Sequence, residues 1–190
     1  EVFNAQVSVL LGPGINIKRS PLCGRNFEYF SEDPYLAGQL GSSYVQSLQG
    51  TGVAACLKHF AANSQETHRQ TADSRIDPRA LREIYLSAFE TVIKTAKPAS
   101  VMAAYNKLNG TYACENRSLL TDILRREWGF DGAVISDWGA CTNLTRALQA
   151  GMDLEMPDSR GIHKKLLRRD LAAGKIDPAA IETAAHRVAK

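Results

Sequence analysis

Short, continuous apolar runs alternate along this chain with longer segments of helical periodicity. The runs are Val7–Leu11, Val53–Leu57, Val101–Ala104, Ala133–Ile135 and, more weakly, Met152–Met156. They are apolar at nearly every position rather than at every second one, which is typical of parallel strands covered on both faces. Strands and helices in regular succession predict an α/β fold with a parallel sheet.

Three helical segments share one start signal, an Asp directly followed by Pro. The Asp side chain can accept hydrogen bonds from the first free N–H groups of a helix, and Pro suits the first helical position because it has no N–H. The pairs are Asp33-Pro34, Asp77-Pro78 and Asp177-Pro178. Two more helices are predicted, one capped by Ser118 and ended by Gly129, the other over residues 161–173.

The residues after the apolar runs separate two α/β architectures. No GxGxxG or P-loop motif follows any run, which disfavours a doubly wound nucleotide fold. Polar residues follow the runs instead: Lys58-His59, Tyr105-Asn106, Asp137, and Asp153 with Glu155. In a (β/α)8 barrel this end of the strands carries the active site. A whole barrel takes about 250 residues, so five βα units in 190 residues predict a TIM-like barrel that is incomplete in this chain.

Composition excludes several classes of partner. The chain has 23 Lys and Arg against 20 Asp and Glu, a net charge of +3 that is too balanced to indicate a nucleic-acid or anionic-membrane partner. No apolar run approaches the roughly 20 residues of a membrane span. Four cysteines without a CxxC pair, and two histidines nine residues apart without a third ligand in register, give no metal site. No signal-peptide pattern is visible, and the compartment stays open.

Asp137 stands in the sharpest candidate site, the segment Ile135-Ser136-Asp137-Trp138-Gly139. An Asp at the end of a strand can act as a nucleophile, a base or a metal ligand, and Trp138 could shape a sugar pocket by stacking. The alternative is an Asp that caps the following helix. The pattern alone leaves both interpretations open.

Other polar segments hold further candidates. Lys58 and His59 together, at the end of an apolar run, suit recognition of hydroxyl groups or an anion, since an unpaired charge there is costly. The long loop Arg19–Pro34 carries Arg25, and the loop Asn63–Arg75 carries His68 and Arg69. Either loop could contact a ligand or form ordinary surface.

Four motifs in one order resemble glycoside hydrolase family 3, in its β-glucosidase variant: GRNFEYFSEDP, KHFAANSQE, VMAAYNKLNG and VISDWGA. The resemblance runs from about Val7 to the C-terminus. It implies the central and C-terminal part of that family's catalytic barrel over residues 1–190. It also implies that the early barrel strands and a following α/β sandwich domain belong to another segment or another chain.

The resemblance also implies roles for individual residues. Asp137 would be the nucleophile of a retaining reaction, in which a second carboxyl about 5–5.5 Å away serves as acid and then base. The residues expected to bind the sugar are Arg25, Lys58, His59, Met102, Tyr105 and Trp138. The acid/base is expected outside this chain, because His68 and Asp73 lack the context of the family branch that uses a His–Asp pair. Glu155 would stand at the closing wall of the barrel.

The implied activity is the removal of terminal β-D-glucosyl residues from short oligosaccharides or aryl β-glucosides, without metal or organic cofactor. Two alternatives stay open. One is a β-xylosidase or another exo-β-glycosidase of the same family, which differs in whether the pocket accommodates the C6 hydroxymethyl group. The other is a non-catalytic sugar-binding protein or an inactive fragment.

Overall fold

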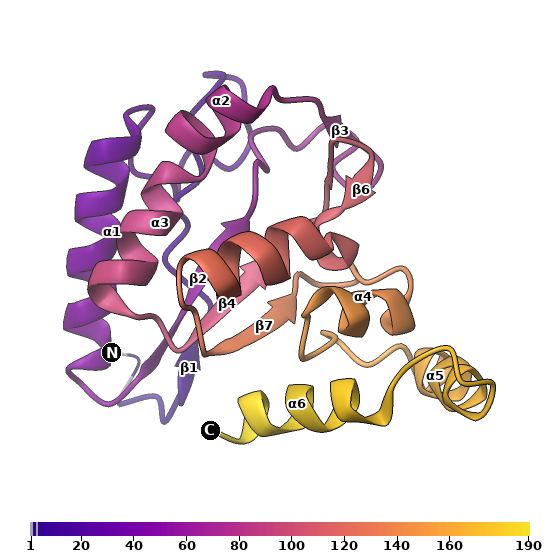
Figure 1. Ribbon diagram of the computed structural model, residues 1–190. Coiled ribbons are helices and arrows are strands. Elements are labelled where there is room, and N and C mark those ends of the chain that lie inside the picture. Colours follow the sequence, from indigo (N-terminus) through magenta and orange to yellow (C-terminus); the bar gives the residue numbers. More distant parts are fainter. Residues whose placement is uncertain (1, 3) are drawn as a thin grey trace.

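A parallel sheet with helices along one face forms the centre of the molecule (Figure 1). The computed structural model describes residues 2 and 4–190. The strands are β1 (Val9–Leu10), β2 (Ala54–Phe60), β4 (Ser100–Ala103) and β7 (Ala133–Ser136), hydrogen-bonded in that order and all parallel. The prediction of an α/β parallel sheet is confirmed. Strand order that follows chain order without reversal is that of a barrel wall, not of a doubly wound sheet.

The prediction of a fifth strand at Met152–Met156 is wrong. It contributes one parallel bridge, between Leu154 and Ile135, together with a hydrogen bond of 2.9 Å from the Ser136 N–H to the Leu154 carbonyl. The segment therefore lies beside β7, where the next barrel strand belongs, but pairs at one point. The first predicted strand also shortens, from Val7–Leu11 to Val9–Leu10.

Helices α1 (Pro34–Gln49), α3 (Ser87–Ala96) and the π-helix η3 (Ser118–Glu127) pack on one face of the sheet and share one hydrophobic core with it. A short α2 (Pro78–Ala80) and a π-helical turn η1 (Leu81–Tyr85) precede α3. The remaining helices are α4 (Leu144–Ala150), α5 (Ile162–Ala172) and α6 (Pro178–Ala189). In Figure 1, α1 and α3 lie side by side.

The three Asp-Pro predictions are confirmed, since the carboxylates of Asp33, Asp77 and Asp177 each accept a hydrogen bond from a first-turn N–H. The predicted cap at Ser118 is wrong. Asn116 accepts from the Leu119 N–H at 3.0 Å instead, and Ser118 is the first residue inside η3.

A second, three-stranded sheet was not expected. Its strands are β3 (Asp73–Ser74), β5 (Lys107–Leu108) and β6 (Thr111–Tyr112), in the order β3-β5-β6, followed by the 3-10 turn η2 (Ala113–Glu115). β5 and β6 form a hairpin through Asn109-Gly110, both with positive φ. This small sheet ties the loop after β2 to the loop after β4, and so holds both loops over the carboxyl ends of the central strands.

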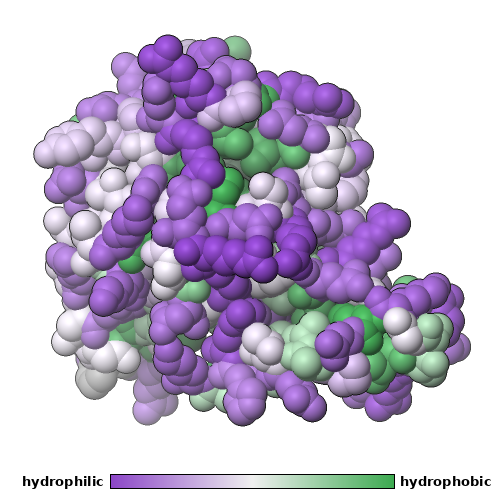
Figure 2. Space-filling view, viewed as in Figure 1, coloured by the Kyte–Doolittle hydropathy of each residue, from purple (hydrophilic) through white to green (hydrophobic). Residues whose placement is uncertain are grey.

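The opposite face of the central sheet carries a small core cluster of Cys56, Met102 and Ile135. Side chains alternate along a strand, so these residues point away from Leu57 and Val134, which face the helices. Figure 2 shows a mostly hydrophilic surface with an apolar area at the lower right, around α5 and α6. Within residues 2 and 4–190, no helix has the length and apolarity needed to cross a membrane.

Candidate active site

Asp137 lies directly after β7, at the carboxyl end of the central sheet. Its N–H donates to the Ala103 carbonyl of β4 at 3.0 Å, which continues the ladder by one residue and fixes the backbone. The residue is 7% exposed. The helix that follows begins with Asn143 as its cap, so the helix-cap interpretation of Asp137 is wrong.

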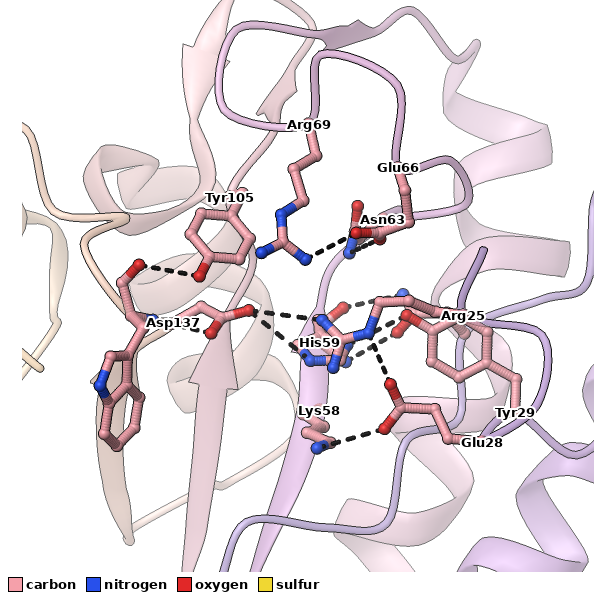
Figure 3. Close-up of polar contacts among 12 residues, drawn as sticks. Arg25, Glu28, Tyr29, Lys58, His59, Asn63, Glu66, Arg69, Tyr105 and Asp137 are labelled. Carbon is pink, nitrogen blue, oxygen red and sulfur yellow. Dashed lines mark hydrogen bonds and ion pairs between the residues drawn. The ribbon is translucent and has the colours of Figure 1, made fainter. Parts of the chain in front are cut away.

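The two carboxylate oxygens of Asp137 have different surroundings (Figure 3). Oδ1 accepts from the Trp138 N–H at 2.7 Å. Oδ2 is buried and has no hydrogen-bond partner among the described residues. It faces Arg25 Nη1 at 3.8 Å and His59 Nε2 at 3.6 Å. Among the seven buried side-chain atoms of the described residues that lack a partner, it is the one carboxylate oxygen. Because it also faces two donors, it can take part in chemistry or bind a ligand.

His59 lies inside β2, rather than after it as expected, because β2 extends to Phe60. Asn16 holds its backbone from both sides: the His59 N–H donates to Asn16 Oδ1 at 2.7 Å and Asn16 Nδ2 donates to the His59 carbonyl at 2.9 Å. The ring contacts the Tyr29 hydroxyl through Nδ1 at 3.1 Å. Burial, together with the neighbouring cations of Arg25, Lys58 and Arg69, lowers the pKa of His59 to about 2, so the imidazole is neutral.

Glu28 joins two predicted sugar-binding cations. Its Oε1 accepts from Arg25 Nε at 2.5 Å, and its Oε2 lies 3.2 Å from Lys58 Nζ. One carboxylate thus compensates part of the charge of both cations and sets the Arg25 guanidinium beside Asp137. Figure 3 shows Glu28 between Arg25 and Lys58.

Tyr105 lies on the other side of Asp137. Its hydroxyl donates to the Trp138 carbonyl at 2.8 Å, and burial together with the charge of Asp137 raises its pKa. The guanidinium of Arg69 stacks 4.3 Å from the centroid of the Tyr105 ring. Arg69 is held by Glu66 at 2.6 Å. The loop Asn63–Arg75, for which both a ligand contact and ordinary surface were left open, therefore places Arg69 beside the site.

Met102 and Trp138 have weaker connections to this network. Met102 is buried with Cys56 and Ile135, beneath the end of the strand that leads to Tyr105. Trp138 contacts its neighbours through its backbone, and the residue is 46% exposed. The structure brings Arg25, Lys58, His59, Tyr105 and Asp137 to one place. Tyr29, Asn16 and Glu28 belong to the same place but were not singled out from the sequence.

His68 and Asp73 line a separate cavity of about 650 Å³, between the loops after β1 and β2, whose lining includes neither Asp137 nor His59. Both oxygens of the Asp73 carboxylate are occupied, one by the Gly110 N–H at 2.8 Å and the other by Arg75 at 2.5 Å.

His163 of α5 belongs to a second, separate cluster of polar side chains. Its Nδ1 lies 2.5 Å from Glu155 Oε1, and its side chain is 17% exposed. Cys141 lies beside them, and the three ligand atoms are all within 4.8 Å of one another. Among the described residues this is the group whose donor set could hold a metal ion.

Known proteins are similar in sequence to this chain over most or all of its length. Residues 1–190 match the family profile described as glycosyl hydrolase family 3 N terminal domain. Thermostable beta-glucosidase B of Acetivibrio thermocellus is 56% identical over 184 residues, which is 97% of this chain and 24% of that protein. An exo-alpha-(1->6)-L-arabinopyranosidase of Bifidobacterium longum is 57% identical over 159 residues, 84% of this chain and 21% of that protein.

A solved structure agrees with these relatives. Beta-glucosidase 3B from Thermotoga neapolitana, in complex with glucose, superposes with a TM-score of 0.94 at 48% identity and covers 98% of this chain and 27% of that one. The chain thus spans about a quarter of the length of its relatives. The expected incomplete TIM-like barrel is confirmed. The chain belongs to glycoside hydrolase family 3, as part of that family's N-terminal barrel domain.

Proposed function

We propose that the protein containing this chain is a retaining β-glucosidase that removes terminal, non-reducing β-D-glucosyl residues with Asp137 as its nucleophile. The observation that carries this proposal is the buried Oδ2 of Asp137, which has no hydrogen-bond partner among the described residues and faces two donors, Arg25 and His59. Relatives named beta-glucosidase, at 56% and 58% identity, support the same assignment.

The reaction proceeds in two displacements at the anomeric carbon. Asp137 Oδ2 forms a bond to that carbon while the bond to the leaving oxygen breaks, and a carboxylic acid gives the leaving oxygen its proton. A water then attacks the resulting glycosyl ester, loses its proton to the same carboxyl group and releases Asp137 as a carboxylate. We place that acid/base outside this chain, in the α/β sandwich domain expected to complete the enzyme together with the rest of the barrel.

The surrounding donors suit the sugar hydroxyl groups. Arg25 and Lys58 carry charged N–H groups, while neutral His59 offers one N–H. Hydrogen bonds that tighten as the ring approaches its oxocarbenium-like transition state lower the barrier, whereas equally strong ground-state bonds do not. In this proposal Met102 and Trp138 line the pocket, Tyr105 holds the Asp137–Trp138 segment, and no metal or organic cofactor takes part.

A second sugar specificity also has specific support. The Bifidobacterium longum relative, at 57% identity, is named an exo-alpha-(1->6)-L-arabinopyranosidase. L-Arabinopyranose and D-xylopyranose both lack the C6 hydroxymethyl group of glucose, so the same machinery with a tighter pocket would favour either one. Comparing kcat/KM for aryl β-D-glucoside, β-D-xyloside and α-L-arabinopyranoside separates these specificities.

The test uses Asp137→Ala in the full-length protein with an activated aryl β-glucoside. We expect kcat to fall on the order of 10⁶-fold, as for the loss of a catalytic nucleophile elsewhere. Azide should restore turnover, because it can occupy the space left by the carboxylate and attack the anomeric carbon from the same side. The product should be the α-glucosyl azide. The control is Asp122→Ala, which removes an exposed carboxylate on η3. Full activity of Asp137→Ala would contradict the proposal.

A further inference from the structure

We propose that Tyr29 is a positioning residue: its hydroxyl donates to His59 Nδ1 and thereby fixes the tautomer whose Nε2–H faces Asp137. The kinetic part of this inference rests on the proposed function, whereas the tautomer itself does not. Tyr29 lies in the loop after β1, within the GRNFEYF motif, and it contacts His59 of β2 from 30 residues away.

The two nitrogens of the His59 ring face two different groups. Nδ1 lies 3.1 Å from the Tyr29 hydroxyl, and Nε2 lies 3.6 Å from Asp137 Oδ2. Tyr29 is 3% exposed and His59 1% exposed, so bulk water does not compete for either contact. The rings meet edge to face, with centroids 6.1 Å apart at 71°.

The charge state of the site allows one arrangement of protons. The imidazole is neutral, so one ring nitrogen carries a hydrogen and the other a lone pair. A hydrogen on Nδ1 would turn the Nε2 lone pair toward the carboxylate oxygen, and two acceptors would face each other. A hydrogen on Nε2 faces Oδ2 favourably and leaves Nδ1 to accept from Tyr29. Burial raises the pKa of Tyr29, which keeps its hydroxyl protonated and able to donate.

The remaining neighbours of His59 fit this arrangement. Asn16 fixes the His59 backbone through two hydrogen bonds, so only the side-chain torsions of His59 can still vary. The cations of Arg25, Lys58 and Arg69 surround the ring and oppose a second proton. Asp137 and Tyr29 thus favour the same tautomer, since the carboxylate faces the Nε2–H and the Tyr29 hydroxyl donates to the Nδ1 lone pair. The Nε2–H becomes a preset donor for Asp137 or for a sugar hydroxyl.

The experiment measures the tautomer in the full-length protein by NMR of ¹⁵N-labelled histidine. The His59 signals are those that disappear in His59→Gln. The wild type should show the Nε2–H tautomer, and Tyr29→Phe should show a mixture of the two. The variant should also lower kcat/KM for an aryl β-glucoside about tenfold, the usual effect of one lost hydrogen bond. Tyr85→Phe is the matched control, because its hydroxyl accepts from Arg19 Nε at 3.2 Å away from Asp137.

Two results would overturn the inference. One is a wild-type His59 with its hydrogen on Nδ1, which needs no variant to detect. The other is a Tyr29→Phe protein that keeps the pure Nε2–H tautomer and normal kinetics. Failure of the proposed function can be told apart from failure of this inference, because the NMR measurement of the tautomer does not depend on catalysis. The tautomer result would stand even if the enzyme were inactive, or if Asp137→Ala kept its activity.

Discussion

Two buried aspartates beside β7 have opposite surroundings, Asp153 level with the second residue of the strand and Asp137 just past its carboxyl end. Asp137 follows β7, and Asp153 precedes Leu154, the residue that bridges to β7. The Asp153 side chain is 0% exposed and fully paired: Oδ2 accepts from Arg125 at 2.5 Å and from the Val134 N–H at 2.8 Å. Its Oδ1 accepts from Arg187 at 3.1 Å.

Asp137 is nearly as buried but keeps one oxygen unpaired, with its nearest cationic groups at 3.6 and 3.8 Å. In the proposed mechanism this difference separates a structural carboxylate, Asp153, from a reactive one, Asp137. Asp153 ties η3, β7 and α6 together, and both of its carboxylate oxygens are engaged. A carboxylate in two ion pairs is a poor nucleophile, whereas a carboxylate with a free oxygen in a polar pocket can attack.

The largest effect on stability is expected at Asp153. Asp153→Asn leaves the buried Arg125 without its charge partner, and breaking such a pair costs about 3–5 kcal/mol. We expect the free energy of unfolding to fall by that amount in chemical denaturation, while kcat per folded molecule stays unchanged. Asp137→Asn is the matched substitution and should change stability by less than about 1 kcal/mol. Equal stability losses in the two variants would remove the distinction.

The neutral state of His59 predicts a pH dependence. In the folded protein the pKa of His59 is lowered to about 2, against an ordinary value of 6.5. Between these two pH values the unfolded chain binds a proton at His59 and the folded chain does not. Stability therefore falls as the pH drops below about 6.5, by at most about 1.4 kcal/mol per pH unit. The measurement is the slope of unfolding free energy against pH in the wild type and in His59→Gln. The slope should be flatter in the variant, and parallel slopes would contradict a neutral His59.

The smallest effect concerns Glu28, which holds the cations beside Asp137. Glu28→Gln keeps the shape but removes the charge that Arg25 and Lys58 share. We expect kcat/KM to fall about tenfold, equivalent to about 1.4 kcal/mol. Glu83→Gln is the control, because Glu83 forms an exposed pair with Arg79 on one helical turn. If both variants behave alike, Glu28 does not organise the pocket.

The main strands and helices of the fold were predictable, because the buried strands are continuous apolar runs and the helices show a helical period of apolar residues. The two-residue strands of the small sheet were not, since pairs such as Lys107–Leu108 have no period to detect. The turn Asn109-Gly110 between them is a hairpin signal that could have revealed β5 and β6. Conversely, Met152–Met156 is apolar enough for a strand but pairs only at Leu154.

The candidate site divides in the same way. The strand-end rule led to Lys58, His59 and Asp137, because parallel strands deliver those residues to one edge. Asn16, Glu28 and Tyr29 come from the loop after β1, whose path is set by tertiary contacts. Glu28 and Tyr29 lie within the GRNFEYFSEDP motif, but the motif does not indicate which contacts they make. Burial and partners also had to be seen, because the sequence marks both Asp137 and Asp153 as acidic residues at apolar runs without telling a paired carboxylate from an unpaired one.

The most direct measurement is covalent trapping with a 2-fluoro-β-glucoside carrying a good leaving group, followed by tryptic peptide mapping of the full-length protein. The two aspartates fall on separate peptides, 127–146 for Asp137 and 147–160 for Asp153. The account predicts one fluoroglucosyl group per molecule, on Asp137, and none in Asp137→Asn. A label on the peptide with Asp153 or elsewhere, or inactivation without any covalent label, would contradict it.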